Sequence, residues 1–321
     1  MEVIKYMNYT NKDMCAILLC SHLALDDNVK PFSLKEWDAF LQNLKAFGFT
    51  PDIIFSENDS WLTDMNYSTT QQERIKKLIS RGISLAFALD DLNDIGINLV
   101  TIFDRKYPIL LRKKLKFKAP PILFYSGNLS LVNKIGISVV GSRNVDEAGS
   151  EFAKSLVQKA VGEELMIFSG GARGVDKISE NTALACGGGA VSYISDSLTS
   201  KIKRKDIRQA LLNRRLLLLS DVNPEAPFSV GRAMNRNKFV YASSYGAFVV
   251  QSDYNKGGTW NGAMESIKNN YTNTFVWNNN KYHGNEKLIE NGGMPYNLTD
   301  DKLFPIITNT NDVKKDQPGL F

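Results

Sequence analysis

The first third of the chain has a helical hydrophobic pattern. Apolar residues recur there every three or four positions, which is the spacing of one face of an α-helix: Leu34, Trp37, Leu41, Leu44. Ser33 and Glu36 form a capping box before this stripe and mark the start of the helix. A second amphipathic helix is expected over Thr70–Arg81, ended by Gly82. Residues 1–92 are therefore predicted to be a small helical module that packs on the rest of the protein.

From Ile135 onward the pattern changes, and short apolar runs alternate with longer helical patterns such as Glu147–Val161. Continuous apolar runs of this length are typical of strands buried on both faces of a parallel sheet. The expected strands are Ile137–Val140, Leu165–Phe168, Ala190–Ile194, Leu216–Leu219, Ala247–Val250 and Thr274–Trp277. Strands that alternate with helices predict right-handed βαβ units. The fold class is therefore α/β, a Rossmann-like, mostly parallel sheet with helices on both faces.

Two stretches flank this alternating region. Leu99–Phe103 resembles an earlier strand, and prolines then keep a basic lead-in extended, with lysines at Lys113, Lys114, Lys116 and Lys118. For these lysines a solvated loop and a DNA contact are both open. Residues 297–321 are polar, and we expect a loosely held tail. The predicted division is thus a helical module over 1–92, a Rossmann-like region over 93–296 and a tail over 297–321.

Composition narrows the class of protein. The chain has 321 residues, 43% apolar and 23% charged, as in an ordinary globular protein, and its net charge of +5 is too small to prove nucleic-acid binding. We find neither a membrane-spanning apolar run nor a signal-peptide pattern, so a cytoplasmic protein without membrane contact is expected. Cys15, Cys20 and His22 could be zinc ligands, but burial on one helix is the favoured interpretation, and no metal or cofactor is expected.

Glycine-rich turns follow three of the expected strands. They are Gly141-Ser142-Arg143, the segment with Ser169, Gly170, Gly171, Arg173 and Gly174, and Gly257-Gly258-Thr259. Backbone N–H groups at a strand-to-helix turn face an incoming anion, and the helix dipole favours negative charge. Arg143 and Arg173 could clamp a phosphate bidentately. We therefore predict one phosphate-binding surface at the carboxyl edge of the sheet, where Asp176 bonds loop N–H groups.

Further cations and aromatic rings extend this prediction. After the third strand comes a basic cluster in which Lys201 and Arg204 are the candidates for phosphate contact. Arg232 and Arg236 are four residues apart, hence on one helical face, and Asn237 and Lys238 follow; such a face suits contacts to a nucleic-acid backbone. Five aromatic residues in these regions could stack a base: Phe228, Phe239, Tyr241, Tyr254 and Trp260. The best candidates are Tyr254 and Trp260, which flank the third Gly turn.

The order of these motifs resembles the DNA-processing protein A family, also called DprA or Smf. The resemblance runs from about Leu99 to Tyr296 and rests on Tyr107-Pro108, Pro120–Asn128, the Gly turns and Arg236–Ser244. It implies a non-catalytic protein that binds single-stranded DNA in a basic pocket, forms a homodimer and helps to load a RecA-type recombinase in DNA recombination. From the Gly turns and the arginines beside them we expect the DNA to be held through its phosphates, with little base preference. The match places Arg236 and Asn237 on the family's Arg-Asn pair. Family members often carry a winged-helix domain after the sheet, for which this chain is too short.

The sequence departs from the family pattern in several places. Ser142 stands where the family has threonine, Lys238 replaces a second arginine, and the paired Gly170-Gly171 is not usual. These atypical loops and the missing winged helix leave a second interpretation open. The protein could be a nucleic-acid- or nucleotide-sensing subunit of an anti-phage defence or toxin–antitoxin module, with a toxin as its partner.

The third interpretation of the sequence is that the protein is an enzyme. The turn at Gly257 also resembles that of nucleotide phosphoribohydrolases, whose catalytic glutamate would fall on Gly262, whereas Glu265 comes three residues later. We therefore expect no hydrolytic activity. Self-association is expected as well, because the apolar run Phe275–Trp277 could lack a covering neighbour at the end of the sheet.

Overall fold

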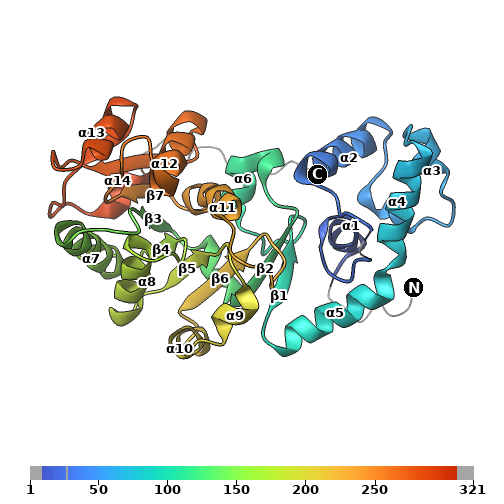
Figure 1. The fold of residues 1–321 in the computed structure, drawn as a ribbon, viewed down its shortest axis with the longest axis horizontal. Helices are drawn as coiled ribbons and strands as arrows, with labels where there is room; N and C mark the ends of the chain where they lie inside the picture. Colours follow the sequence, from blue (N-terminus) through green and yellow to red (C-terminus); the bar gives the residue numbers. More distant parts are fainter. Residues whose placement is uncertain (1–8, 27, 309–321) are drawn as a thin grey trace.

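The computed structural model describes residues 9–26 and 28–308. Its centre is a nine-stranded sheet in the order β1-β2-β6-β5-β4-β3-β7-β8-β9 (Figure 1). The strands are β1 (Asn98–Thr101), β2 (Ile122–Gly127), β3 (Gly136–Val140), β4 (Met166–Ser169), β5 (Ala190–Tyr193), β6 (Leu216–Ser220), β7 (Gly246–Val249), β8 (Asn273–Trp277) and β9 (Met294–Tyr296). The six strands expected after residue 135 are thereby confirmed as β3 to β8, each to within a residue at either end.

The sheet is mostly parallel, and its strand order reverses at the centre. From β3 the chain adds β4, β5 and β6 on one side, then crosses to the other side of β3 for β7, β8 and β9, all in parallel. Only the pairs β1–β2 and β2–β6 are antiparallel among the strands described. The connections from β3 and β7 therefore leave in opposite directions, which opens a crevice at the carboxyl ends of these two strands. The Rossmann-like α/β class is confirmed.

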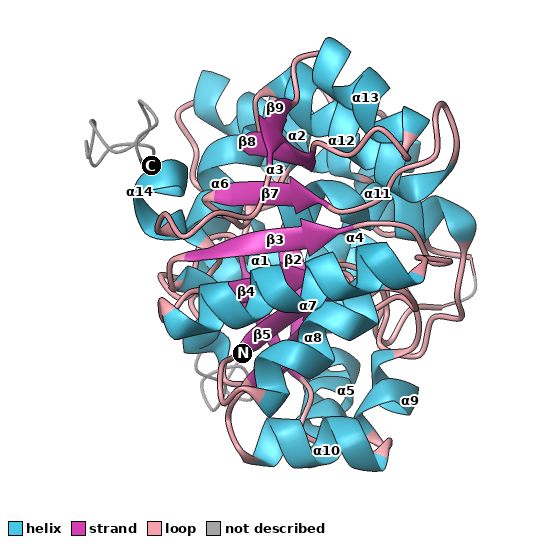
Figure 2. Cartoon of the chain, turned by 90° about the vertical axis from the view of Figure 1, so that its left-hand side faces the viewer, coloured by secondary structure: helices cyan, strands magenta, loops and turns pink. Residues whose placement is uncertain are grey.

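Helices cover both faces of the sheet. They are α1 (Asn11–Cys20), α2 (Leu34–Ala46), α3 (Ser60–Asp64), α4 (Thr69–Ser80), α5 (Gly82–Asp94), α6 (Ile109–Leu115), α7 (Glu147–Gly162), α8 (Val175–Ala185), α9 (Leu198–Ile202), α10 (Lys205–Leu212), α11 (Val230–Ala242), α12 (Gly257–Asn269), α13 (His283–Glu290) and α14 (Leu303–Thr308). Figure 2 shows α7 and α8 in front of the central strands. Alternate residues of a strand enter opposite cores: Ile137 and Val139 pack with α7, whereas Val140 packs with α11.

The N-terminal helices share a hydrophobic core with one end of the sheet. All residues of α1 from Asp13 to Cys20 are buried, and this helix contacts β1 and β2. Leu99, Phe124 and Leu218 of the sheet belong to the same cluster as the apolar face of α2. In Figure 1 these helices stand beside β1 at the far end of the molecule from α13. Burial against strands explains why short helices are stable here.

The helix boundaries near Gly82 differ from the expectation. The capping box of Ser33 and Glu36 is present, but Gly82 begins α5 and does not end the helical region. Arg81 lies at the bend between α4 and α5, and its buried guanidinium donates to the carbonyl oxygens of Leu18, Leu23 and Ser21. These long-range bonds fix a bend that local propensity does not reveal.

The basic lead-in is also structured. Its lysines lie on α6 and on the short 3₁₀ helix η3 (Lys116–Lys118), so the extended loop expected there was wrong. Lys114 Nζ donates to the carbonyl oxygen of Ser244 at 2.7 Å, which ties α6 to the end of α11. Two further 3₁₀ helices are η2 (Pro51–Phe55) and η4 (Leu129–Asn133).

The expected loose tail is wrong for residues 303–308, which form α14. Leu303 and Ile307 are fully buried in the core that contains α7. The Glu163 carboxylate accepts the first N–H groups of this helix, from Leu303 at 2.8 Å and Phe304 at 2.9 Å. A carboxylate in this position satisfies free helix donors and the helix dipole. The rest of the predicted tail, 309–321, lies outside the described residues.

The expected exposed end at β8 is wrong too. β9 pairs with β8, Phe275 stacks on Phe248 at 4.8 Å, and Trp277 stacks on Phe152 at 4.2 Å. The edge strand β9 is only three residues long and contains Pro295, which has no N–H to offer a further strand. Self-association therefore has no support from this edge.

Cys15 and Cys20 lie inside α1, where burial raises the pKa of both thiols. Over the described ranges we find no group of three or more His, Cys, Asp or Glu residues placed to hold a metal ion. A helix long and apolar enough to cross a membrane is likewise absent from these ranges.

Candidate functional site

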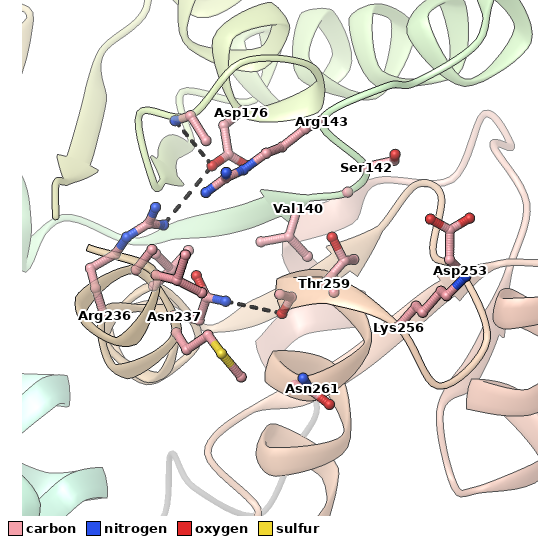
Figure 3. A pocket seen from close by; sticks show the side chains of 18 of the residues that line it. Val140, Ser142, Arg143, Asp176, Arg236, Asn237, Asp253, Lys256, Thr259 and Asn261 are labelled. Atoms are coloured by element: carbon pink, nitrogen blue, oxygen red, sulfur yellow. Dashed lines mark hydrogen bonds and ion pairs between the residues drawn. The ribbon is translucent and has the colours of Figure 1, made fainter. Parts of the chain in front are cut away.

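The three Gly turns meet at the carboxyl edge of the sheet, where the strand order reverses. Two adjoining cavities open there, of about 430 and 300 Å³. The larger lies between the turn after β3, helix α11 and the start of α12 (Figure 3), and the smaller lies between the turn after β4 and the loop after β5. Four residues line both cavities: Arg143, Ala172, Phe228 and Arg236. The two cavities are thus neighbouring parts of one groove.

Backbone contacts hold the turns together. Val175 N–H donates to the Ser142 carbonyl at 3.2 Å, and Ser142 N–H donates to the Gln251 carbonyl at 2.9 Å. A Cβ atom on Gly141 would come within 2.5 Å of the Val175 side chain, so glycine is needed for this close approach. The position of the first turn is therefore fixed by its neighbours on both sides.

Arg236 occupies the floor of the groove. It comes from α11 and is only 5% exposed, because its guanidinium enters the space beside Gly170. Its Nη1 lies 3.9 Å from Oδ2 of Asp176 in the first turn of α8, and Figure 3 shows the two side chains facing each other. The Arg236 Nε has no hydrogen-bond partner among the described residues. This cation therefore keeps capacity to bind an anion.

Asp176 is a perturbed carboxyl group. Burial, partly offset by Arg236, raises its pKa to about 6. Glu180, one turn along α8, raises the pKa further, while Arg143 opposes the shift. The Ala172 N–H donates to its Oδ2 at 3.4 Å, as predicted for a group that holds the loop. The charge of the Asp176 carboxyl group beneath the groove thus changes around pH 6.

The outer wall of the groove is cationic and aromatic. The exposed Arg143 guanidinium lies 5.5 Å from the centre of the Phe228 ring, a cation–π contact. Lys201 Nζ donates to the Gly171 carbonyl at 3.2 Å and pairs with Asp196 at 3.3 Å. Chain segments far apart in sequence therefore place their cations around the smaller cavity.

Helices α11 and α12 approach closely on the other side. Asn237 Nδ2 donates to the Gly258 carbonyl at 3.0 Å (Figure 3). A Cβ atom on Gly262 would lie 3.1 Å from the Tyr241 ring, so a glutamate would crowd that ring. Glu265 accepts a hydrogen bond from Tyr271 Oη at 3.1 Å and does not line either cavity. The close packing of α12 on α11 therefore leaves little room for a glutamate at Gly262, where the hydrolases have their catalytic residue.

Most of the predicted residues come together in the groove. Those that line it are Gly141, Ser142, Arg143, Gly170, Gly171, Arg173, Lys201, Arg236, Asn237, Gly257, Gly258 and Thr259. Those that do not are Ser169, Gly174, Arg204, Arg232 and Lys238.

The cationic side chains that do not line the groove have hydrogen-bond or ion-pair partners nearby. Arg204 pairs with Asp206 at 3.0 Å, Arg232 donates to the Pro227 carbonyl at 2.6 Å, and Lys238 Nζ donates to Asn235 at 2.6 Å. Arg232 and Arg236 lie four residues apart on α11 as expected, but of these two only Arg236 lines the groove.

The two preferred aromatic rings lie outside both cavities. Trp260 is buried, whereas Tyr254 is 51% exposed and packs edge-on against Trp260 with ring centres 5.1 Å apart. Base stacking on Tyr254 therefore stays a prediction. Phe228, which is also 51% exposed, lines both cavities. A usable sequence signal was its position in the proline-flanked loop before α11, where no apolar period accounts for a phenylalanine.

Two curated proteins are similar to this chain over about half of its length. Streptococcus pneumoniae DNA processing protein DprA is 31% identical over 169 residues, 51% of this chain and 58% of the relative. Bacillus subtilis DNA processing protein DprA is 27% identical over 164 residues, 50% of this chain and 54% of the relative. The chain thus spans about half the length of these curated relatives.

Solved structures share the fold. S. pneumoniae DNA processing protein A aligns with a TM-score of 0.66 at 20% identity, covering 90% of this chain and 95% of that one. The Helicobacter pylori DNA processing protein A, solved for its single-stranded DNA binding mode, gives a TM-score of 0.52 at 21% identity over 66% of this chain and 94% of that one. The family model of DNA recombination-mediator protein A matches residues 98–304, which is more than half of the sequence. This protein therefore belongs to the DNA recombination-mediator protein A family.

Proposed function

We propose that this protein binds single-stranded DNA in the groove and acts, without catalysis, in DNA processing and recombination. The observation that carries the proposal is the convergence of Arg143, Lys201 and Arg236 with the three Gly turns at one sheet edge. The H. pylori relative, whose described binding mode is for single-stranded DNA, supports the choice of ligand. Guanidinium groups and turn N–H groups suit phosphate, which dominates the affinity of such complexes.

The absence of catalysis is part of the proposal. A hydrolase of the related type needs a carboxylate aimed at the ribose, and this chain has Gly262 there. Asp176, a carboxyl group on the wall of the larger cavity, faces Arg236 and the Ala172 N–H, which suits it to hold the site in shape.

Family membership supports further proposals about partners. We propose that two copies pair, that a RecA-type recombinase is contacted and that the protein works in the cytoplasm. We also propose that the N-terminal helical module ends at about residue 92. No described residue favours a toxin partner or a defence role over recombination.

Arg143→Ala is expected to weaken binding of oligothymidylate and mixed-sequence strands alike. Removing one phosphate contact lowers the slope of log K against log salt by roughly 0.7 to 1. The protein should remain folded, because Arg143 is exposed. Fluorescence anisotropy over a salt series measures both quantities.

The matched control is Arg204→Ala, an exposed arginine that does not line the groove and pairs with Asp206. Its affinity and salt slope should stay near those of the parent. Normal binding by the Arg143 variant together with a loss in the Arg204 variant would move the site onto α9 and α10.

Lower pH is expected to strengthen DNA binding. Asp176 is mostly ionised at pH 7.5 and mostly protonated at pH 5, given its pKa of about 6. Protonation removes a negative charge beside Arg236, with Glu180 and Arg143 the other charged neighbours. If a bound phosphate shifts this pKa by half to one unit, affinity rises roughly three- to tenfold.

Titration of binding from pH 7.5 to pH 5 tests this coupling at fixed salt. Asp176→Asn should bind more tightly than the parent at pH 7.5 and lose most of the pH dependence. A parental pH profile in this variant would assign the effect to another group.

A further inference from the structure

We propose that a long single strand continues beyond the groove to a second contact surface, formed by the short helix η3 and reached along α11. This η3 surface consists of Lys116, Phe117 and Lys118. The inference rests on the proposed binding of single-stranded DNA and adds a contact that only longer strands reach. It follows from the distribution of charge along the chain, from an exposed aromatic ring between two lysines, and from a cationic path that joins this ring to the groove.

The net charge of the chain is concentrated outside the groove. Residues 105–118 contain seven lysines and arginines and no aspartate or glutamate. This stretch contributes +7 to a chain whose net charge is +5, so all other residues together carry −2. Arg112 and Lys114 donate to backbone carbonyl oxygens and hold α6 in place. The stretch as a whole attracts an anionic polymer, and its attraction extends about 8–10 Å at moderate salt.

The helix η3 presents an aromatic ring between two lysines. Phe117 is 61% exposed, and the Lys118 amine lies 6.0 Å from the centre of its ring, a cation–π contact. Lys116 has φ +53° and ψ −122°, a conformation that glycine adopts far more easily than lysine. Such a backbone persists only where its surroundings fix it, and here Leu115 and Ala119 are buried on either side. The turn therefore holds the ring outward, and a ring among cations suits a base with its phosphate.

Helix α11 carries a path from the groove toward η3. Met234 lines the larger cavity, and Lys238 follows four residues later on the same face, about 6 Å along the helix axis. Lys238 Nζ donates to the Asn235 side-chain oxygen at 2.6 Å, a neutral partner that does not cancel its charge. A strand that leaves the groove over Met234 therefore meets a cation next.

The path meets η3 at its other end. Helix α6, which precedes η3, packs on α11 (Figure 1). Burial lowers the pKa of the Lys238 amine, and the nearby charge of Lys118 lowers it further. The carboxylates of Glu265 and Asp221 oppose this shift. Lys118 Nζ also donates to Asn269 Oδ1 at 3.4 Å, at the end of α12. The η3 surface is thus close to both helices that wall the larger cavity.

Continuity with the groove decides between two anionic partners. An acidic protein segment would also suit the lysines of η3, but it gives no role to the path along α11. A nucleic-acid strand uses the groove, the path and η3 together, because its phosphates recur at regular intervals along one chain. The geometry therefore favours single-stranded DNA as the ligand of the η3 surface.

The test measures affinity against strand length, with oligothymidylates from about 4 to about 16 nucleotides, the range of site sizes of single-strand-binding domains. Lys116→Ala combined with Lys118→Ala should leave the shortest strand bound as by the parent. For the longest strand it should reduce the slope of log K against log salt by roughly 1.4, or 0.7 for each lost phosphate contact. Phe117→Ala should weaken the longest strand roughly five- to 150-fold through lost stacking and leave its salt slope unchanged.

Matched controls remove the same groups elsewhere. Lys76→Ala combined with Lys77→Ala removes two exposed charges from α4, and Phe87→Ala removes a ring that is 66% exposed on α5. Both should bind every length like the parent. Arg143→Ala should weaken short and long strands by the same factor, because it acts in the groove. Lys116→Gly, which suits the positive φ, replaces the alanine substitution at this position should the double variant fail to fold.

The outcomes separate this inference from the function on which it rests. Equal losses on all lengths in the folded η3 variants would overturn the second contact, because the effect would then lie in the groove. Parental binding of the longest strand by these variants would overturn it as well, and would leave the lysines to an acidic protein segment. Failure of the parent to bind a strand of any length would overturn the proposed function itself.

Discussion

Arg236→Ala is expected to abolish binding to single-stranded DNA and to lower the free energy of unfolding by about 3 kcal/mol. Both losses follow from the burial of this side chain, which is 5% exposed and faces Asp176 at 3.9 Å. Removing one partner of a buried ion pair leaves the other charge in a poor environment. The sequence placed Arg236 on a helical face suited to nucleic-acid contacts, and its burial adds a structural role that the sequence did not show.

Urea unfolding and DNA titration separate the two losses. Arg236→Ala combined with Asp176→Asn should regain much of the stability, since no buried carboxylate remains, but none of the binding. Arg143→Ala supplies the exposed control and should unfold like the parent. A single Arg236 variant as stable as the parent would show that Asp176 does not depend on this cation.

The stability loss should also depend on pH. The folded protein raises the pKa of Asp176 from 3.8 to about 6, so the folded state binds the proton more tightly than the unfolded chain does. The stability from this proton is full below pH 3.8 and is lost as the pH rises through about 6. The deficit of Arg236→Ala should therefore be smaller at pH 5 than at pH 8.

The strands and turns of the site could be predicted because their signals are local. A run such as Leu216–Leu219 must be buried on both faces, and the glycines after β3 and β4 mark sharp turns wherever the strands lie. The strand pairing then places those turns at one edge. In contrast, β9 and α14 are short and weakly patterned, and they are stabilised by contacts with β8 and Glu163 from earlier parts of the chain.

The direction in which each cationic side chain points could not be predicted from the sequence, because it too depends on contacts with distant segments. Arg204, Arg232 and Lys238 resemble Arg236 in type and setting, yet each finds a nearby acceptor. Arg236 turns inward because the space beside Gly170, far away in the chain, admits its guanidinium. Phe228 was considered but ranked below Tyr254 and Trp260, because the preference rested on nearness to a Gly turn along the sequence and not on exposure. Such choices depend on tertiary contacts between segments distant in sequence.

Gly170→Ala is expected to weaken DNA binding while costing less stability than Arg236→Ala. A Cβ atom on Gly170 would lie 1.4 Å from Arg236 Nη1 and 2.3 Å from its Cζ, so the guanidinium cannot keep its place. The atoms displaced are the far end of a flexible side chain, and the backbone of the turn can stay as it is. Loss of a charged hydrogen-bonding group from the site should weaken binding roughly ten- to hundredfold.

A double-mutant cycle tests whether Gly170 acts through Arg236. In the Arg236→Ala background, Gly170→Ala should cause no further loss of stability, because the guanidinium it would displace is gone. The control substitution is Gly162→Ala at the end of α7, where an added Cβ meets nothing within 4 Å. If Gly170→Ala instead destabilises both backgrounds equally, the glycine is needed for the turn itself, and the inward path of Arg236 has another cause. Additive stability losses would therefore contradict the direct coupling between these two positions.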